Sequence, residues 1–451
     1  MTFQDATVYI ESFINHELYL DQSTPKTFSL DNMKRLLAAL NHPEKDLYVV
    51  HIAGSKGKGS TAAMTASVLE QAGFSVGLYT SPHIYNVRER IRVLRKSSIK
   101  AKVKDLFPDQ ISEEDYAVLV ENLKPVLEKV RGERREKPLS YFEVLTALAL
   151  CYFQQQKTDV VILETGLGGR LDATNAVDSE ICAITPISYE HTKLLGNSLT
   201  EIAVEKAAII KAAGQQVIVS EQVDEVNDVI RRRCSEFGIN PRIVGEDIQY
   251  EAVSQDDHGQ VCHVHARSIY ENLQLSLLGA HQIINAAACI GIIEALIEQK
   301  FEISRESVYK GLSVVSWPGR MEVIAKSVRT VFDGAHNRSS ARFLAGCLKM
   351  MFPLGNITIV LGVLKDKDCL GICDELTHVA NKVIATQAQH PRAYPFRKGE
   401  LEKVFAEQPC FYTRSVEDAL NLAYKETAEG GAVVVTGSIF VVGEARGFLE
   451  D

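Results

Sequence analysis

A glycine-rich stretch, HIAGSKGKGSTAAM, holds residue types that could bind phosphate groups. It lies between a strand-like run, YVVHIAG, and a helix expected over 58–72. Backbone N–H groups at a helix start and lysine side chains both attract phosphate oxygens. The spacing departs from the standard P-loop, because Ile52 occupies the first glycine position and Gly59 separates Lys58 from Ser60. From this stretch alone, a phosphate-binding loop and a flexible glycine turn both remain open.

Acidic and hydroxyl side chains that follow two other strand-like runs could hold a magnesium ion. Glu164 ends the apolar run VVILE, and Ser81 follows the run VGLYT. Open α/β sheets bind ligands at the carboxyl ends of their strands, and magnesium prefers oxygen ligands. The stretch after Ser81 also carries Arg88 and Arg90, which could bind an anionic substrate. The alternatives are a glutamate solvated by its loop and a solvated basic turn.

Two residues of the stretch ISYEHTKLLGNSLTEIAVEKAAIIK are further candidates. His191 follows a third strand end, and a lone histidine there is more often a loop or packing residue than a metal ligand. Lys206 lies inside the apolar run VEKAAII, where a lysine is unusual unless it is paired or modified. Glu201 and Glu205 would equally allow an ordinary helix surface with salt bridges.

Four polar residues lie around the proposed domain boundary at SWPGR, where Pro318 and Gly319 interrupt any regular element. Interdomain clefts are favoured ligand sites, and an aspartate at a strand end can bind a ribose. The candidate nucleotide-binding residues of this region are Asn285, Arg320, Asp333 and His336.

The elements that must position these residues form an alternating pattern. Short β-branched runs alternate with amphipathic helical stretches, as in parallel sheets with crossover helices. Helices are expected over 113–130, 141–155, 199–213, 281–299, 339–350, 369–380 and 415–427. The stretch 249–278 shows period-2 strands and predicts a small antiparallel appendage. We predict one domain over 1–316 and a smaller Rossmann-like α/β domain over 317–451.

Composition excludes several other classes of function. The net charge of −9 disfavours a general nucleic-acid or anionic-membrane binder. No window approaches 18 consecutive apolar residues, and the first residues do not resemble a secretory signal, so we expect a cytoplasmic protein. Nine scattered cysteines without a C-x-x-C pair fit reduced thiols. A metal site at Cys262, His263 and His265 is disfavoured, because no second ligand pair lies nearby in the sequence.

Taken in order, eight motifs resemble those of the folylpolyglutamate synthase and dihydrofolate synthase family, within the Mur-ligase superfamily. They are AGSKGKGS, TSPH…RERI, LSYFE, ETGLGGRLDATN, EHTKLLG…EKAAIIK, GAHQIINAA, WPGR and DGAHN, from about Tyr48 to Asn337. The resemblance implies an α/β fold, with an N-terminal P-loop-type ATPase domain that carries the antiparallel appendage and a smaller C-terminal Rossmann-like domain.

The resemblance also implies an ATP-dependent amide ligase. Such an enzyme adds L-glutamate to dihydropteroate, to (poly)glutamylated tetrahydrofolate, or to both, through an acyl phosphate. The expected partners are small molecules, with magnesium as cofactor, and a monomer is expected. One rival is a Mur-type ligase acting on a cell-wall precursor, against which LSYFE and RLDATN argue. The other is a non-catalytic nucleotide-binding protein, which the joint presence of Ser60, Ser81, Glu164, His191 and Lys206 disfavours.

Residue by residue, the resemblance assigns Lys58, Lys206 and His191 to catalysis, with Lys206 carbamylated. The residues that it assigns to ATP are Gly57, Lys58, Gly59, Ser60, Asn285, Arg320, Asp333 and His336. It assigns Ser81, Glu164 and His191 to magnesium, and Ser140, Leu171, Asp172 and Ala173 to the acid substrate. The chain departs from the family pattern at two nearby positions: Glu190 replaces the usual aspartate, and Ala208 replaces glycine. A lysine-rich segment between Arg95 and Pro108 is expected to be a surface loop.

Overall fold

The computed structural model describes residues 1–17, 29–96, 107–133, 138–256, 259–324, 328–353 and 355–448. The chain divides into two compact units. The first comprises Met1–Val253, Val261–Leu275 and Ala280–Val315, and the second Ser254–Gln260, Ser276–Gly279 and Ser316–Asp451. Most of the lysine-rich segment expected to be a surface loop, residues 97–106, lies outside the described residues.

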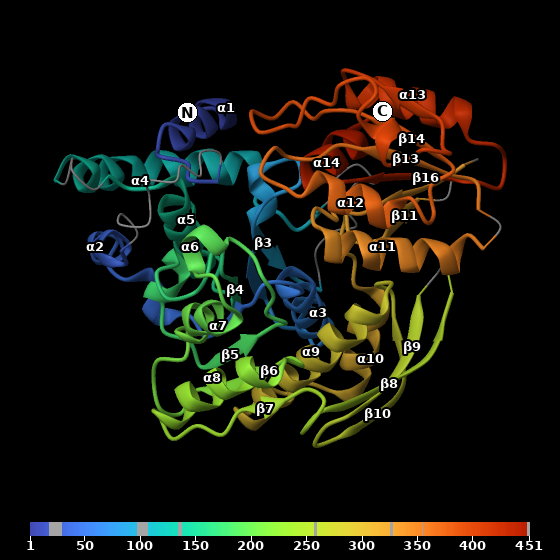
Figure 1. Cartoon of the computed structure of the whole chain (residues 1–451). Helices are drawn as coiled ribbons and strands as arrows, with labels where there is room; N and C mark the ends of the chain where they lie inside the picture. Colours follow the sequence, from blue (N-terminus) through green and yellow to red (C-terminus); the bar gives the residue numbers. More distant parts are fainter. Residues whose placement is uncertain are drawn as a thin grey trace. The chain divides into compact units, whose positions relative to one another are not determined.

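The first unit is built around a seven-stranded sheet in the order β3-β2-β4-β1-β5-β6-β7 (Figure 1). Its strands are β1 Val49–Ala53, β2 Val76–Tyr79, β3 Ile91–Leu94, β4 Val160–Glu164, β5 Ile181–Ile184, β6 Gln216–Val219 and β7 Arg242–Ile243. Neighbouring strands are parallel, except that β2 and β3 pair antiparallel. Because β1 is the central strand, the glycine-rich loop that follows it lies in the middle of the sheet's carboxyl edge.

Helices cover both faces of this sheet. One face presents Val49, Tyr79 and Leu163 to an apolar cluster with α1, α2, α4 and α5, and a second cluster on that face joins β5 and β6 to α7 and α8. On the opposite face, α3 packs on α9 and α10, and Gly291 of α9 contacts Ile218. The helices of this unit are α1 Phe3–Glu11, α2 Asp31–Ala39, α3 Lys58–Gln71, α4 Glu113–Glu133, α5 Tyr141–Gln155, α6 Thr192–Leu195, α7 Leu199–Ala207, α8 Asp224–Ser235, α9 Ala280–Glu298 and α10 Arg305–Val314.

The predicted appendage is a three-stranded sheet in the order β10-β9-β8. Its strands are β8 Gln249–Gln255, β9 Gln260–His265 and β10 Ile269–Leu275. The links between them are too short for a crossover, so consecutive strands run antiparallel, as predicted. His263 and His265 lie on one face of β9 with their rings stacked, and no cluster of metal-ligating side chains occurs among the described residues.

The second unit contains a six-stranded sheet in the order β11-β12-β16-β13-β14-β15. Its strands are β11 Glu322–Ile324, β12 Arg329–Phe332, β13 Ile357–Leu361, β14 Lys382–Ala385, β15 Cys410–Tyr412 and β16 Ala432–Thr436, and its helices are α11 Arg338–Met351, α12 Cys369–Leu376, α13 Val416–Glu426 and α14 Ile439–Gly447. Only the β11–β12 pair is antiparallel among the pairings of this sheet. The predicted α/β class, with two parallel sheets, is confirmed.

Two helices end earlier than predicted. The helix expected over 199–213 ends at Ala207, after which the N–H groups of Ile209 and Ile210 donate to oxygens three residues back and those of Lys211 and Ala212 donate to the side-chain oxygen of Gln215. The helix expected over 369–380 ends at Leu376, after which the chain turns toward β14.

Among the residues that the structure describes, one helix, α9, is long and apolar enough to cross a membrane by length and composition alone. Of its most apolar window, 78% is buried inside the first unit. Its residues Ala286, Cys289 and Ile293 are fully buried, so its apolar character is that of a core helix.

Candidate active site

The glycine-rich loop joins the central strand β1 to α3, and its geometry requires glycine. Gly57 is the N-cap of α3 and has a φ of 83°, in the left-handed region. A Cβ atom at this position would also lie 2.3 Å from Oδ1 of Asn285, a buried residue of α9. The structure therefore places Asn285 directly beside the loop, with Lys58, Gly59 and Ser60 in the first turn of α3. The loop has the strand–loop–helix context that the sequence predicted for a phosphate site.

Two lysines converge on one carbonyl oxygen of this loop. Lys58 Nζ donates to the Gly54 oxygen at 3.0 Å, and Lys206 Nζ donates to the same oxygen at 2.8 Å. Lys206 comes from the last turn of α7, and its side chain is 1% exposed. Two carboxylates accompany the lysines: Glu190 Oε1 lies 2.6 Å from Lys206 Nζ, and Glu164 Oε1 lies 4.0 Å from Lys58 Nζ. Two cations and two anions thus share one edge of the sheet.

This arrangement shifts the pKa values of the closest pair. Burial lowers the pKa of Lys206 to about 8, an effect that Glu190 partly opposes. Burial acts to raise the pKa of Glu190, but Lys206 and then Lys58 outweigh it and lower this pKa to about 2. Lysines are seldom buried without a partner, and Glu190 supplies that partner. Lys206 is therefore a buried, paired residue, and the alternative of an exposed helix surface is wrong.

The predicted magnesium ligands are brought together in part. The Ser81 backbone N–H donates to Glu164 Oε2 at 3.2 Å, so Ser81 lies next to this carboxylate. His191 lies at the start of α6 with a φ of 43°, and its charge acts on the neighbouring Glu190. One carboxylate and one hydroxyl suit magnesium, which usually retains water molecules and binds substrate phosphates. The described residues hold no group of three His, Cys, Asp or Glu side chains around a common point.

Arg90, which the sequence offered as an anion ligand, is engaged inside the protein. Its guanidinium donates to both carboxylate oxygens of Glu17, at 2.8 and 2.6 Å, and to His83 Nδ1 at 2.9 Å. The Arg90 side chain is 1% exposed. It is not accessible to a substrate while this bidentate pair is in place.

Two of the predicted acid-substrate residues hold local backbone. Ser140 is the N-cap of α5, and its hydroxyl both accepts from the Glu143 N–H and donates to the Glu143 carboxylate. The Asp172 carboxylate accepts hydrogen bonds from the N–H groups of Gly166 and Leu167, at 2.9 and 2.8 Å. The side chain of Asp172 therefore shapes the glycine loop that follows Glu164. Leu171 and Ala173 flank Asp172 in the same segment.

In the second unit, Asp333 follows β12 at the carboxyl edge of the sheet. Its carboxylate accepts from the N–H groups of Met321 at 3.0 Å and Ala335 at 2.9 Å. Burial raises its pKa, and Arg320 opposes that rise. His336 Nδ1 lies 2.8 Å from the Gly334 oxygen, just before α11. The structure thus brings Arg320, Asp333 and His336 close together at one strand end of the second unit, whereas Asn285 lies on α9 of the first unit.

Sequence reasoning missed two contributors to the first site. The Gly54 carbonyl carried no signal, because any residue has one. His51 and Thr174, which lie beneath Asp172, form a fully buried hydrogen-bonded pair. A histidine inside the otherwise apolar strand YVVHIA was the available signal.

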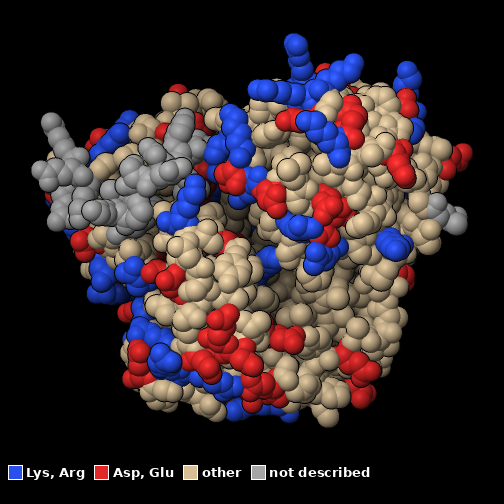
Figure 2. Space-filling model, in the orientation of Figure 1, with Lys and Arg blue, Asp and Glu red and all other residues tan. Residues whose placement is uncertain are grey.

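On the face drawn in Figure 2, lysines and arginines are interspersed with acids.

Comparison with known proteins agrees with this geometry. The chain matches the Mur ligase middle domain over residues 52–293 and the Mur ligase, glutamate ligase domain over residues 319–439. It is 33% identical to the dihydrofolate synthase/folylpolyglutamate synthase of Bacillus subtilis, over 92% of this chain and 94% of that protein. It is 28% identical to the folylpolyglutamate synthase of Lacticaseibacillus casei, over 99% of this chain and 98% of that protein.

Solved structures give the same result. The Mycobacterium tuberculosis folylpolyglutamate synthase complexed with ADP superposes with a TM-score of 0.85 at 27% identity, over 99% of this chain and 98% of that chain. Escherichia coli FolC in complex with DHPP and ADP superposes with a TM-score of 0.82 at 28% identity, over 100% of this chain and 98% of that chain.

The fold has two parallel sheets, two lysines meet at the glycine-rich loop after β1, and both Mur ligase domains match. These findings define an ATP-dependent ligase of the Mur ligase fold. Within that class, the chain belongs to the folylpolyglutamate synthase/dihydrofolate synthase family. The predicted family and enzyme class are confirmed, and the rival readings are not favoured.

Proposed function

We propose that this enzyme uses ATP to join L-glutamate to a folate-type acid, either dihydropteroate or a reduced folate that already carries glutamate. The observation that supports this proposal best is that Lys58 and Lys206 both donate to the Gly54 carbonyl, beside Glu164 and Glu190. Such a cluster can stabilise negative charge that develops on phosphate and acyl oxygens. The names of the Bacillus subtilis and Lacticaseibacillus casei relatives support the substrate class.

The reaction requires a leaving group better than hydroxide. A carboxylate oxygen of the acid attacks the γ-phosphorus of ATP, and the bond to the bridging oxygen breaks to release ADP and leave an acyl phosphate. The amine of glutamate then attacks the acyl carbon, phosphate leaves, and the amine loses a proton. Gly57, Gly59 and Ser60 present backbone N–H groups and a hydroxyl to the phosphates, and Lys58 balances the charge transferred to ADP.

The residues present fit a magnesium ion, since Glu164 and Ser81 provide a carboxylate and a hydroxyl, with His191 as a further donor. A bound magnesium ion would supply Lewis-acid stabilisation of phosphate charge. Lys206 fits carbamylation, which needs a neutral amine: its pKa is lowered by burial, and it lies against the phosphate loop. Glu190 competes with this modification, because it holds Lys206 as an ammonium.

The remaining assignments follow the same proposal. Residues 1–316 would form the ATP-binding domain and residues 317–451 the ligase domain, with Asn285, Arg320, Asp333 and His336 binding the nucleotide. Ser140, Leu171, Asp172 and Ala173 would lie at the acid substrate, in part through backbone groups, because two of their side chains are already engaged. We expect a monomeric, cytoplasmic enzyme.

The decisive experiment incubates the purified full chain with magnesium, ATP and L-glutamate, and offers dihydropteroate or tetrahydrofolate in separate reactions. We expect ADP release that depends on both the acid and glutamate, with a new glutamyl amide detected by mass spectrometry. ADP release only with a cell-wall precursor would contradict the proposal. Reaction with one acid alone would fix which of the two activities the enzyme has.

A further inference from the structure

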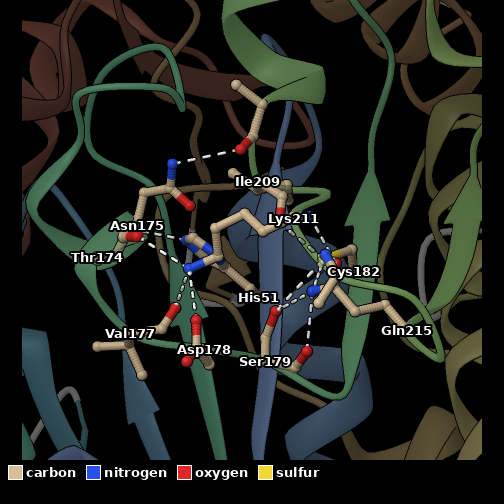
Figure 3. Close-up of polar contacts among 12 residues, drawn as sticks. His51, Thr174, Asn175, Val177, Asp178, Ser179, Cys182, Ile209, Lys211 and Gln215 are labelled. Carbon is tan, nitrogen blue, oxygen red and sulfur yellow. Dashed lines mark hydrogen bonds and ion pairs between the residues drawn. The ribbon is translucent and has the colours of Figure 1, made fainter. Parts of the chain in front are cut away.

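A polar seam, buried except at Lys211, crosses the first face of the seven-stranded sheet, between its two apolar clusters (Figure 3). The seam consists of His51, Thr174, Asn175, Ser179, Cys182, Lys211 and Gln215. Its far end fixes the chain after the 3-10 turn Ala173–Ala176: Lys211 Nζ donates to the backbone oxygens of Asn175 at 2.9 Å and Val177 at 2.6 Å. Gln215 Nε2 donates to the Ser179 oxygen at 2.8 Å.

The near end of the seam reaches Asp172. His51 Nε2 lies 2.8 Å from Thr174 Oγ1, and this hydroxyl donates to Asp172 Oδ1 at 2.5 Å. The Thr174 backbone N–H donates to the same oxygen at 3.0 Å. His51 and Thr174 are both fully buried. A hydroxyl has one proton, which Thr174 gives to Asp172, so His51 must donate to Thr174 from Nε2.

The chain of hydrogen bonds from His51 through Thr174 to Asp172 is called the relay below. Its direction agrees with the environment of His51. Burial, and then the charge of Lys211, lower the pKa of His51 to about 3, so the ring is neutral near pH 7. Its proton lies on Nε2, and Nδ1 has no hydrogen-bond partner among the described residues. The neutral ring thus acts as a fixed donor.

The relay ends at the loop after Glu164. Asp172 Oδ2 accepts from the Gly166 and Leu167 N–H groups, so the orientation of its carboxylate sets the path of this loop. The loop packs tightly, since a Cβ atom at Gly166 would lie 2.6 Å from the Phe142 ring. Phe142 belongs to the stretch LSYFE, which includes Ser140. One end of the relay lies on β1, which leads into the phosphate loop, and the other lies among the residues proposed for the acid substrate.

We infer that His51 and Thr174 are positioning residues for the acid substrate, because they fix Asp172 and, through it, the loop that follows Glu164. They do not contact the reacting atoms. The inference rests on the proposed function, which supplies the acid. It requires that loss of the relay raises the KM for the acid more than the KM for ATP, since the glycine-rich loop after β1 keeps its own contacts to Asn285 and Lys206.

The test compares two pairs of variants in the full chain. Thr174→Val removes the hydroxyl without changing the side-chain shape, and Thr174→Ser restores it. His51→Leu removes the donor, and His51→Gln retains an N–H at the Nε2 position. We expect Thr174→Val and His51→Leu to raise the KM for the acid about tenfold while the KM for ATP changes less than about twofold. Serine and glutamine should restore most of the loss.

A matched control breaks the same seam away from Asp172. Gln215→Met removes five hydrogen bonds of a buried side chain but leaves the relay intact. It should lower the temperature of unfolding without a selective rise in the acid KM. If Gln215→Met produced the same selective rise, the effect would be general loosening and the inference would be wrong.

Nitrogen NMR of labelled histidine provides a readout that does not depend on activity. His51, assigned from its loss in His51→Gln, should be the Nε2–H tautomer and should change its signal in Thr174→Val. An Nδ1–H tautomer in the wild-type enzyme would overturn the relay. If the wild-type enzyme used neither folate-type acid, the proposed function would fail, and the substrate role would fail with it. An active wild type with no selective effect in Thr174→Val and His51→Leu would overturn the inference alone.

Discussion

The two parallel sheets each end in a polar site, but the two sites differ in how they handle charge. At the edge of the first sheet, Lys58 and Lys206 meet at the Gly54 oxygen, and Glu164 and Glu190 accompany them. At the edge of the second sheet, a single carboxylate, Asp333, is held by two backbone N–H groups and faces Arg320.

The difference separates two kinds of task. Several buried or partly buried charges held close together can stabilise negative charge that develops during a reaction, and removing one leaves others uncompensated. A buried carboxylate fixed by backbone donors has a rigid geometry, which suits recognition of a hydroxyl such as a ribose. We therefore expect variants at the first edge to lower turnover and variants at the second edge to weaken nucleotide binding.

The largest effect is expected at Lys58. Lys58→Met should lower kcat/KM about 10³-fold, because it removes a cation positioned against the transferred phosphate. Steady-state ADP release measures this. Lys45→Met, at an exposed lysine of the turn Pro43–Asp46, is the control and should change the rate little. A loss in Lys58→Met confined to the KM for ATP would mean that Lys58 only binds the nucleotide.

Lys206→Ala should lower turnover about 10²-fold, and added bicarbonate should not restore it. The variant leaves Glu190 without its buried partner and removes the amine needed for a carbamate. Incubation with labelled bicarbonate should give a carbamate carbon signal in the wild-type enzyme that Lys206→Ala lacks and that the exposed-lysine variant Lys193→Ala retains. A near-normal rate in Lys206→Ala would reject a catalytic role for this residue.

At the second edge, Asp333→Asn should raise the KM for ATP about tenfold with little change in kcat, equivalent to about 1.4 kcal/mol of binding energy. Asparagine keeps an acceptor oxygen for only one of the two N–H groups, because Met321 donates to Oδ2 and Ala335 to Oδ1, and it loses the charge that a ribose hydroxyl would bind. Deoxy analogues of ATP sharpen the test: the wild-type enzyme should discriminate against the analogue lacking the contacted hydroxyl, and Asp333→Asn should not. Unchanged discrimination would move the ribose contact elsewhere.

The sequence predicted the components of both edges but not their contacts. Strand–loop–helix periodicity located Lys58 and Asp333, because Lys58 starts the helix after the glycine-rich loop of β1, Asp333 directly follows β12, and local spacing decides both places. The Lys206–Gly54 hydrogen bond joins residues 152 positions apart, so it depends on how α7 packs against the central strand. The predicted end of α7 was wrong for a related reason: beyond Ala207 the backbone N–H groups of Lys211 and Ala212 pair with the Gln215 side chain, a contact that helix periodicity does not reveal.

The last prediction concerns stability rather than catalysis, and it rests on the buried His51 of the first sheet. Because the folded pKa of about 3 lies below the value of about 6.5 in the unfolded chain, the unfolded state binds more protons between these values. The contribution of His51 to the free energy of unfolding is therefore complete above pH 6.5 and is lost as the pH falls toward 3. At pH 5 the loss amounts to about 2 kcal/mol.

Urea unfolding of the wild type and of His51→Gln at pH 7 and pH 5 measures this contribution. Glutamine keeps the donor to Thr174 but does not titrate, so the variant should lose about 2 kcal/mol less stability than the wild type on acidification. His83 and the buried aspartates remain in both proteins, and their effects cancel in the difference. Equal losses in the two proteins would mean that His51 is not held neutral in the folded state. His51 would then donate to Thr174 as an imidazolium, not as the neutral Nε2–H tautomer.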